Sequence, residues 1–131
     1  MITRTGTHAL KAMVVLGHLP PGRYAGAGAI AARIRAPGNY LGKLLRQLSR
    51  AGIVEGRKGS NGGFRLARSM TTITLFDILD PIEHVAKVKG CFLGKAQCSH
   101  RDPCALHEKW SVLRGEYLGF LRATKLSEAS V

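Results

Sequence analysis

Apolar residues recur at intervals of three and four in the first part of the chain, as they do on one face of a helix. This spacing predicts a helix over 9–19, which the Pro-Pro-Gly sequence at 20–22 ends. A short, alanine-rich helix is predicted over 27–34, with its two isoleucines facing inward. The Ala-Pro-Gly sequence at 36–38 is typical of a turn after it.

A third helix is predicted after that turn. Asn39 can cap its start, and Gly52 can close its end in a left-handed conformation. One apolar stripe marks the face that this helix buries: Leu41, Leu44, Leu45 and Leu48. Two helices joined by a turn of a few residues form a helix-turn-helix.

A β-hairpin is predicted next. Ile53 and Val54 are a short strand signal, 58–63 is a glycine-rich turn, and 64–67 alternates like a returning strand. A glycine-rich loop can also bind a nucleotide, but this one lies between strands and lacks the Lys-Ser ending of such loops. Helix, turn, helix and hairpin in this order predict a mostly α fold with a small β-hairpin wing, a winged helix-turn-helix.

A fourth helix is predicted within 71–85. It is expected to begin near Thr74 or Leu75, because Asp77 then lies in its first turn, where a carboxylate is favourable. Pro81 is expected to bend or restart this helix.

A polar loop over 87–101 precedes a long C-terminal helix. Asp102 can cap that helix, with Pro103 at its first position. Its apolar positions form one seam: Leu106, Trp110, Leu113, Tyr117 and Leu121. Such a seam can pack against a partner helix and predicts a homodimer; the alternative is that it covers its own domain.

Charge is distributed unevenly along the chain, whose net charge is +12. Residues 1–70 contain twelve Lys and Arg against one acid, Glu55, whereas residues 71–131 contain eight bases and seven acids. A half almost free of carboxylates beside a balanced half indicates a surface that binds phosphates, and therefore double-stranded DNA. The alternative is a solvated basic face without a partner.

Composition excludes other classes. The first segment contains Lys11 and His18 within its apolar stretch and lacks a small-residue cleavage site, so no signal peptide is expected. No run approaches the length of a transmembrane helix, and no membrane partner is expected. Three cysteines without a secretory context do not suggest a disulfide framework. We expect a cytoplasmic protein.

Four side chains with affinity for soft or borderline metals lie close together in the sequence: Cys91, Cys98, Cys104 and His107. Thiolates and a histidine suit an iron–sulfur cluster, and they also form a complete tetrahedral set for zinc. No CxxC pair is present, which disfavours structural zinc, and the wide spacing suits a larger object. Three free cysteines without a cofactor are the remaining alternative.

Several segments together resemble one protein family. They are 6–12 (GTHALKA), 39–41 (NYL), 48–54 (LSRAGIV), 59–66 (GSNGGFRL) and, in the C-terminal half, Cys104 to Trp110 with the tail 124–126 (TKL). The chain resembles, nearly from end to end, the IscR/NsrR/RirA family of bacterial winged-helix iron–sulfur transcription regulators. The resemblance implies a homodimer that binds a [2Fe–2S] or [4Fe–4S] cluster, and we favour [2Fe–2S].

The resemblance also implies the ligands. Cys91, Cys98 and Cys104 match the family's three cysteines. In IscR-like proteins the fourth ligand is a histidine matching His107, whereas in NsrR-like proteins it comes from the first helix, near Thr7 or His8 here, plausibly of the partner subunit. Zinc remains the alternative cofactor.

The chain departs from the family pattern in four places. The gap between Cys91 and Cys98 is one residue longer than in IscR-like members. Gly42 lies where IscR has a glutamate, so the DNA sequence preference of IscR is not transferred. Arg35 lies where the turn usually has glycine, and Thr7 replaces the NsrR-type aspartate.

We expect direct contacts to DNA from the third helix and the wing: Asn39, Tyr40, Lys43, Arg46, Gln47, Arg57 and Lys58. The chain then divides into a DNA-binding domain (1–85), a cysteine-bearing cofactor loop (86–102) and a dimerisation helix with its tail (103–131). The predicted function is a DNA-binding transcription regulator, a repressor, whose cluster reports iron or cluster supply, nitric oxide or redox state. The alternative is a thiol-based or zinc-containing regulator without a cluster.

An enzyme is not expected. No acid–base or nucleophile arrangement lies beside the cysteines, and Asp102 and Glu108 are better explained as helix-terminal residues.

Overall fold

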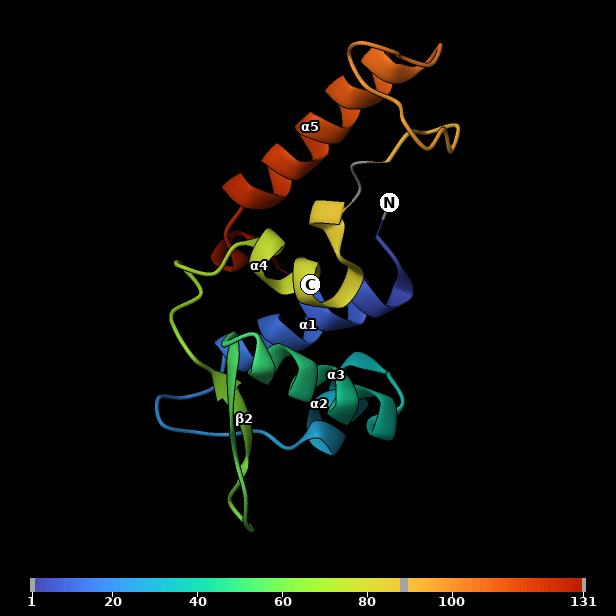
Figure 1. Cartoon of the computed structure of the whole chain (residues 1–131). Helices are drawn as coiled ribbons and strands as arrows, with labels where there is room; N and C mark the ends of the chain where they lie inside the picture. Colours follow the sequence, from blue (N-terminus) through green and yellow to red (C-terminus); the bar gives the residue numbers. More distant parts are fainter. Residues whose placement is uncertain (1, 88–89, 131) are drawn as a thin grey trace.

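The computed structural model describes residues 2–87 and 90–130, which form five α-helices and one two-stranded hairpin (Figure 1). Val88 and Lys89, in the predicted cysteine loop, lie outside the described residues. The elements are α1 (Arg4–Gly17), α2 (Ala27–Ile34), α3 (Gly38–Arg50), β1 (Val54–Arg57), β2 (Gly63–Leu66), α4 (Leu75–Glu83), η1 (Val85–Lys87), α5 (His107–Ala123) and η2 (Leu126–Glu128).

The first helix begins earlier than its apolar pattern predicts. The Thr3 side chain accepts a hydrogen bond from the Gly6 N–H at 3.1 Å and so caps a first turn that is mostly polar. Ala9, Ala12 and Met13 are fully buried, and α1 packs against both α2 and α4. The helix therefore lies at the centre of the fold.

The predicted helix-turn-helix is present, and the leucine stripe of α3 forms its buried face as expected. Asn39 is not the cap, which corrects the prediction. Pro37 occupies the N-cap position, and the helix begins at Gly38. Proline's fixed φ suits an extended residue just ahead of a helix, so Asn39 is already within the first turn. Gly52 has a φ of +80°, as its predicted left-handed conformation requires.

The predicted wing is the antiparallel pair β1–β2, with Val54 opposite Leu66 and Arg57 opposite Gly63. The wing is also tied to the segment before α2, because Ala25 and Phe64 exchange backbone hydrogen bonds of 2.9 and 2.8 Å. Gly63 has a φ of +131°, and a Cβ there would lie 2.4 Å from the Ala25 carbonyl oxygen. Glycine is therefore required where the wing meets the body of the domain.

The fourth helix begins at Leu75, as predicted from the position of Asp77. Thr74 is the N-cap, and Thr74 and Asp77 form a reciprocal capping box. Pro81 does not restart the helix, which continues through it to Glu83 and ends at His84 with a φ of +53°.

The start of the last helix was predicted wrongly. α5 begins at His107, with Leu106 at the N-cap position, rather than after Asp102. The carboxylate of Asp102 forms an ion pair with Lys95 at 2.8 Å, and its backbone N–H donates to the Ser99 carbonyl. Asp102 is therefore held within the loop, and Pro103 is not at the first helical position.

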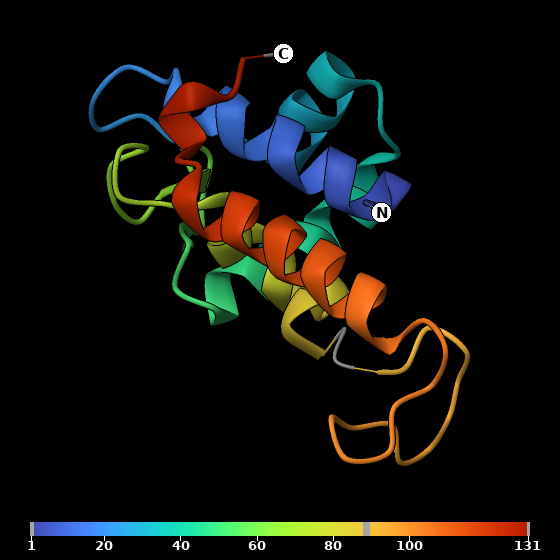
Figure 2. The ribbon, with the colours of Figure 1, turned by 90° about the horizontal axis from the view of Figure 1, so that it is seen from above.

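The predicted seam of α5 divides into two parts. Tyr117 and Leu121 pack against Leu75 and Leu79 of α4, and α5 is seen to run across α4, on the viewer's side, when the molecule is viewed from above (Figure 2). Leu106 and Leu113 of the seam point outward, and together with two residues outside the seam they leave four apolar side chains exposed: Leu106, Val112, Leu113 and Phe120. We call these four residues the exposed α5 face. Thus part of the seam covers its own domain and part does not.

The segment after α5 returns to the core. Leu126 is fully buried and donates its N–H to the Ile73 carbonyl at 2.8 Å. Thr74 and Lys125 form a β-bridge. Among the described residues, no helix is long and apolar enough to cross a membrane.

Replacing Asp77 with Ala should lower the free energy of unfolding by about 1 kcal/mol, because the capping box and the Arg68 contact are both lost. Burial raises the pKa of Asp77, but hydrogen bonds from Thr74 and Arg68 outweigh it and hold the pKa below 3.8. The difference in the free energy of unfolding between the wild type and Asp77→Ala should therefore be complete above about pH 5 and shrink as the pH falls through the folded-state pKa of Asp77. Urea unfolding at several pH values measures this. Glu116→Ala, at an exposed site on α5, is the control, and equal losses in both variants would contradict the prediction.

Candidate metal centre and nucleic-acid interface

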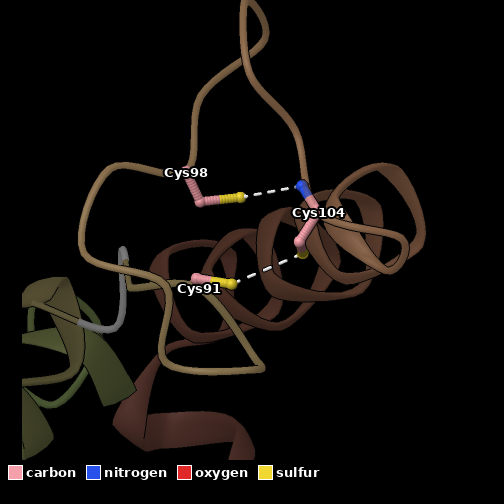
Figure 3. Close-up of side chains that lie close together, drawn as sticks. All are labelled: Cys91, Cys98 and Cys104. Carbon is pink, nitrogen blue, oxygen red and sulfur yellow. Dashed lines mark hydrogen bonds between the residues drawn. The ribbon is translucent and has the colours of Figure 1, made fainter.

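The three cysteines converge on one point (Figure 3). Their Sγ atoms all lie within 4.8 Å of one another, and those of Cys91 and Cys104 are 3.4 Å apart. The sulfur of Cys98 accepts the backbone N–H of Cys104 at 3.3 Å. All three side chains are half-buried, so they are shielded in part and still reachable from solvent.

The loop that carries them is held together by its own contacts. Lys95 bonds to both the carboxylate and the carbonyl of Asp102, which joins the two limbs of the loop. The loop is attached to α5 through Trp110, whose indole N–H donates to the Gly90 carbonyl at 3.0 Å. The rings of Trp110 and Phe92 pack with their centroids 5.3 Å apart. The position of the cysteines thus depends on the first turns of α5.

His107 is placed beside the thiols as the first residue of α5. Its Nδ1 lies 3.2 Å from the sulfur of Cys98, and its Nε2 is buried without a hydrogen-bond partner. The ring of His100 packs edge-on against it at 4.9 Å. A buried imidazole nitrogen without a partner is unusual, and a metal ligand role for this side chain would account for it.

The thiols differ in acidity. A hydrogen bond from the Lys95 N–H lowers the pKa of Cys91 to about 7, against the effect of burial, and the thiol of Cys104 contributes in the same direction. Burial and the neighbouring Cys91 raise the pKa of Cys104. Near neutral pH, Cys91 is therefore the readily available thiolate, which is the form that binds metals and reacts as a nucleophile.

Three thiols and one imidazole fit both an iron–sulfur cluster and a single zinc ion. A tetrahedral ion with metal–sulfur bonds of about 2.3 Å holds its sulfurs about 3.8 Å apart, close to the spacing found here. A cluster with more than one iron needs a wider arrangement. Residues 92–97 of the loop are exposed, so little packing opposes such an opening.

Three of the predicted DNA contacts of α3 lie in its N-terminal half and two, Arg46 and Gln47, in its C-terminal half. Asn39 and Lys43 are exposed, and Tyr40 is half-buried with its ring edge-on to His8 at 5.7 Å. Arg46 is exposed, and its Nε donates to the Gly42 carbonyl at 3.2 Å. These side chains share the exposed side of a helix whose opposite side is buried leucine.

Gln47 differs from the other predicted contacts of α3. Its side-chain amide donates to the Pro81 carbonyl of α4 at 2.9 Å, although the residue is exposed. A base contact by this amide would require that hydrogen bond to break. In the structure Gln47 joins α3 to α4.

The wing presents Arg57 and Lys58 to solvent. Sequence reasoning missed Tyr24, whose ring lies 5.7 Å from the guanidinium of Arg57 and 4.7 Å from that of Arg65. Arg65 also forms an ion pair with Glu55 at 3.0 Å, so the one acid among the first 70 residues is paired. No local pattern marks Tyr24, because its partners come from strands more than 30 positions away.

A second contact that the sequence did not indicate joins the two halves of the chain. The Thr3 N–H donates to the Glu83 carboxylate at 2.8 Å, and the Thr3 hydroxyl contacts the same oxygen. A Cβ at Gly6 would collide with that carboxylate, so glycine is needed there. The end of α4 is thereby fixed to the start of α1.

Comparisons with other proteins agree with this architecture. The Rrf2 family, described as an iron-dependent transcriptional regulator, matches residues 2–130. A protein of Aquifex aeolicus (strain VF5), whose name describes an HTH-type transcriptional regulator, is 32% identical over 96 residues, which cover 72% of this chain and 67% of that protein.

Solved structures show the same fold. The global cysteine regulator CymR of B. subtilis aligns with a TM-score of 0.78 at 24% identity, covering 97% of this chain and 93% of CymR. IscR of T. potens aligns with a TM-score of 0.77 at 22% identity, covering 97% of this chain and 83% of IscR. The predicted winged helix-turn-helix and the predicted family are both confirmed: the chain belongs to the Rrf2 family of iron-dependent transcriptional regulators.

Proposed function

We propose that this chain is a homodimeric, sequence-specific DNA-binding repressor of the cytoplasm. Its affinity for DNA is set by an iron–sulfur cluster, [2Fe–2S] in preference to [4Fe–4S]. The ligands are Cys91, Cys98, Cys104 and His107. The observation that carries the proposal is the convergence of three thiols within 4.8 Å, with the imidazole of His107 in contact with one of them.

The cluster, when bound, supplies a centre that responds to iron supply, nitric oxide or oxidation. The residues of this chain bind the cluster and connect it to the fold. The readily ionised thiol of Cys91 provides a ligand at neutral pH, and the ring of His107 joins the cysteine loop to the first turn of α5. Gain or loss of ligation therefore acts directly on the orientation of α5.

The DNA contacts follow from the exposed side of α3 and from the wing. Asn39 and Lys43 can reach base edges in the major groove, where amide and ammonium groups discriminate among base pairs. Arg57 and Lys58, which extend from the far end of the hairpin, contact phosphates or the minor groove. The cysteine loop and the wing lie at opposite ends of the molecule, so the signal must pass through the domain (Figure 1).

The end of α4 provides that route. It follows the DNA-binding helices and precedes the cysteine loop, and it bonds to α3 through Gln47 and to α1 through Thr3. A rearrangement of the loop pulls on this end of α4 and thus shifts α3. In a dimer, such a shift changes the distance between two recognition helices, which must match half-sites about one DNA turn apart.

The dimer is proposed from the exposed α5 face. Leu106, Leu113 and Phe120 are seven positions apart, so they follow one side of the helix, and Val112 is exposed about 100° further round. Four exposed apolar residues on one helix are costly to leave in water.

A thiol-based regulator is the second candidate. The sulfurs of Cys91 and Cys104 are 3.4 Å apart, and the low pKa of Cys91 favours attack on an oxidant such as a peroxide. Two thiols and one peroxide would then give a disulfide and water. CymR, whose fold this chain shares, has been solved in an oxidized form from Staphylococcus aureus. A zinc ion on the same four ligands is the remaining alternative.

Alanine at Cys91, Cys98 or Cys104 should abolish the visible absorption of anaerobically purified protein, because water does not replace a thiolate ligand. His107→Ala should also remove a [2Fe–2S] spectrum, whereas His100→Ala is the control and should retain it. A normal spectrum in His107→Ala that is lost in His8→Ala would move the fourth ligand to α1. Stoichiometric zinc without iron or sulfide, even after attempted reconstitution, would refute the cluster.

Lys43→Ala should reduce discrimination between the operator and a mismatched site by about 1–3 kcal/mol, if Lys43 contacts a base edge. Lys58→Ala is the matched comparison, because a phosphate contact should weaken both DNAs equally and make the salt dependence shallower. Fluorescence anisotropy at several salt concentrations measures both. Equal losses on the two DNAs in Lys43→Ala would reduce Lys43 to a backbone contact.

Leu113→Glu should convert the dimer to a monomer and weaken operator binding at least tenfold, because a carboxylate would be buried in an apolar interface. Sedimentation velocity gives the mass. Gly115→Glu is the control, since Gly115 lies across the helix from Leu106, Leu113 and Phe120 and its Cβ would meet open space. A dimer that survives Leu113→Glu would place the interface elsewhere.

A further inference from the structure

A basic cavity lies between the start of α1 and the turn that leads into α3. It has a volume of about 470 Å³ and is lined by Arg4, Thr5, His8, Arg35, Pro37 and Tyr40. None of these residues is acidic, and the sequence contains no Asp or Glu before Glu55. Two guanidinium groups, an imidazole and two hydroxyls therefore surround a space that suits an anion.

His8 supplies the first sign of a ligand. Its Nδ1 is buried and has no hydrogen-bond partner in the described structure. Its ring packs edge-on against Tyr40 at 5.7 Å, on the border of the same cavity. Buried polar atoms almost always have partners, so a missing one points to a group that binds there.

Arg35 supplies the second sign. Its φ is +57° and its ψ +51°, the left-handed conformation that favours glycine, at the end of α2. Arginine has no advantage over glycine on this backbone, and its exposed side chain lines this cavity and the neighbouring hollow beside Arg33. Strained residues of this kind gather at functional sites.

We propose that this cavity binds a phosphate group, and that the phosphate belongs to the DNA backbone beside the half-site. The proposal rests on the proposed DNA contact of α3, because Arg35 and Tyr40 lie just before that helix and in its first turn. The planar fork of arginine matches phosphate oxygens, and two such forks with the ring of His8 and the hydroxyl of Tyr40 can surround one phosphate. The base-contacting residues determine which sequence is bound, and this cavity fixes how α1 and α3 sit on the duplex.

Arg35→Gly tests the proposal without harming the fold, since glycine tolerates the left-handed backbone better than arginine. Its thermal midpoint should be equal to or above that of the wild type. Operator binding should weaken about tenfold at low salt, and the slope of log Kd against log salt should become shallower by about 1. Arg33→Ala removes the same charge from the last turn of α2, outside this cavity, and should change Kd less than about threefold.

Replacing single backbone phosphates of the operator with neutral methylphosphonates locates the contact. One replacement beside the half-site should weaken the wild type about tenfold and weaken Arg35→Gly clearly less, because the contact of Arg35 with that phosphate is already lost. Equal sensitivity of the two proteins at every phosphate would overturn the proposed DNA source.

Titration of the DNA-free protein with inorganic phosphate tests whether the cavity binds free phosphate instead of a DNA phosphate. Saturable shifts of the His8 ring protons in the wild type, absent in Arg35→Gly, would support a phosphate site. If these shifts were seen but the wild type and Arg35→Gly were equally sensitive at every DNA phosphate, the cavity would bind a free anion, and the proposed DNA contact would be overturned. If, in addition, inorganic phosphate did not shift the His8 ring protons, the phosphate site itself would be overturned. Weaker operator binding by Lys43→Ala would still support the proposed function, which does not depend on this cavity.

Discussion

The packing of α4 is the constraint on which the rest of the structure depends. This helix contacts α1, α3 and α5, and it lies in the chain between the helix-turn-helix with its hairpin and the cysteine-bearing loop. Its start is fixed by the capping box of Thr74 and by the bridge from Thr74 to Lys125. Its end is fixed by Gln47 and Thr3. With both ends held, a movement of α4 is coupled to α1 and α3.

The two functional regions differ in how firmly they are held. The DNA-binding half rests on a core of fully buried leucines and alanines, and its wing is tied to the body through Ala25 and Phe64. The cysteine loop has mostly exposed residues and depends on polar contacts such as Lys95 with Asp102 and Trp110 with Gly90. A well-packed region preserves the shape that DNA requires, while a loosely packed loop can adapt to a bound metal centre.

Charge separates the two regions as well. The first 70 residues have a single acid, with which Arg65 pairs, and Arg68 pairs with Asp77, so most of the other basic side chains there are available to phosphates. In the second half, acids and bases are balanced, and carboxylates are used within the fold: Asp77 caps α4, Glu83 holds α1 and Asp102 closes the loop. The same residue type therefore has a structural use in one half and is nearly excluded from the other.

The sequence by itself determined the elements whose signals are local. Helical spacing located α2 and the buried stripe of α3, Asp77 located the start of α4, and the glycine-rich turn located the wing. It also singled out the three cysteines that the structure brings within 4.8 Å of one another, because their identities and spacing mark them as a possible metal site. It misplaced the starts of α1, α3 and α5, since a polar first turn and competing partners of Asp102 leave no periodic signal.

Only the tertiary structure decided which side chains meet across long separations. Gln47 is turned toward α4, Tyr24 lies against two arginines of the wing, and Glu83 holds Thr3. It likewise divided the seam of α5, with Tyr117 turned inward and Leu113 outward, although both have the same helical spacing. The physical reason is that periodicity states that a face is apolar, whereas the neighbouring elements determine which part of that face they cover.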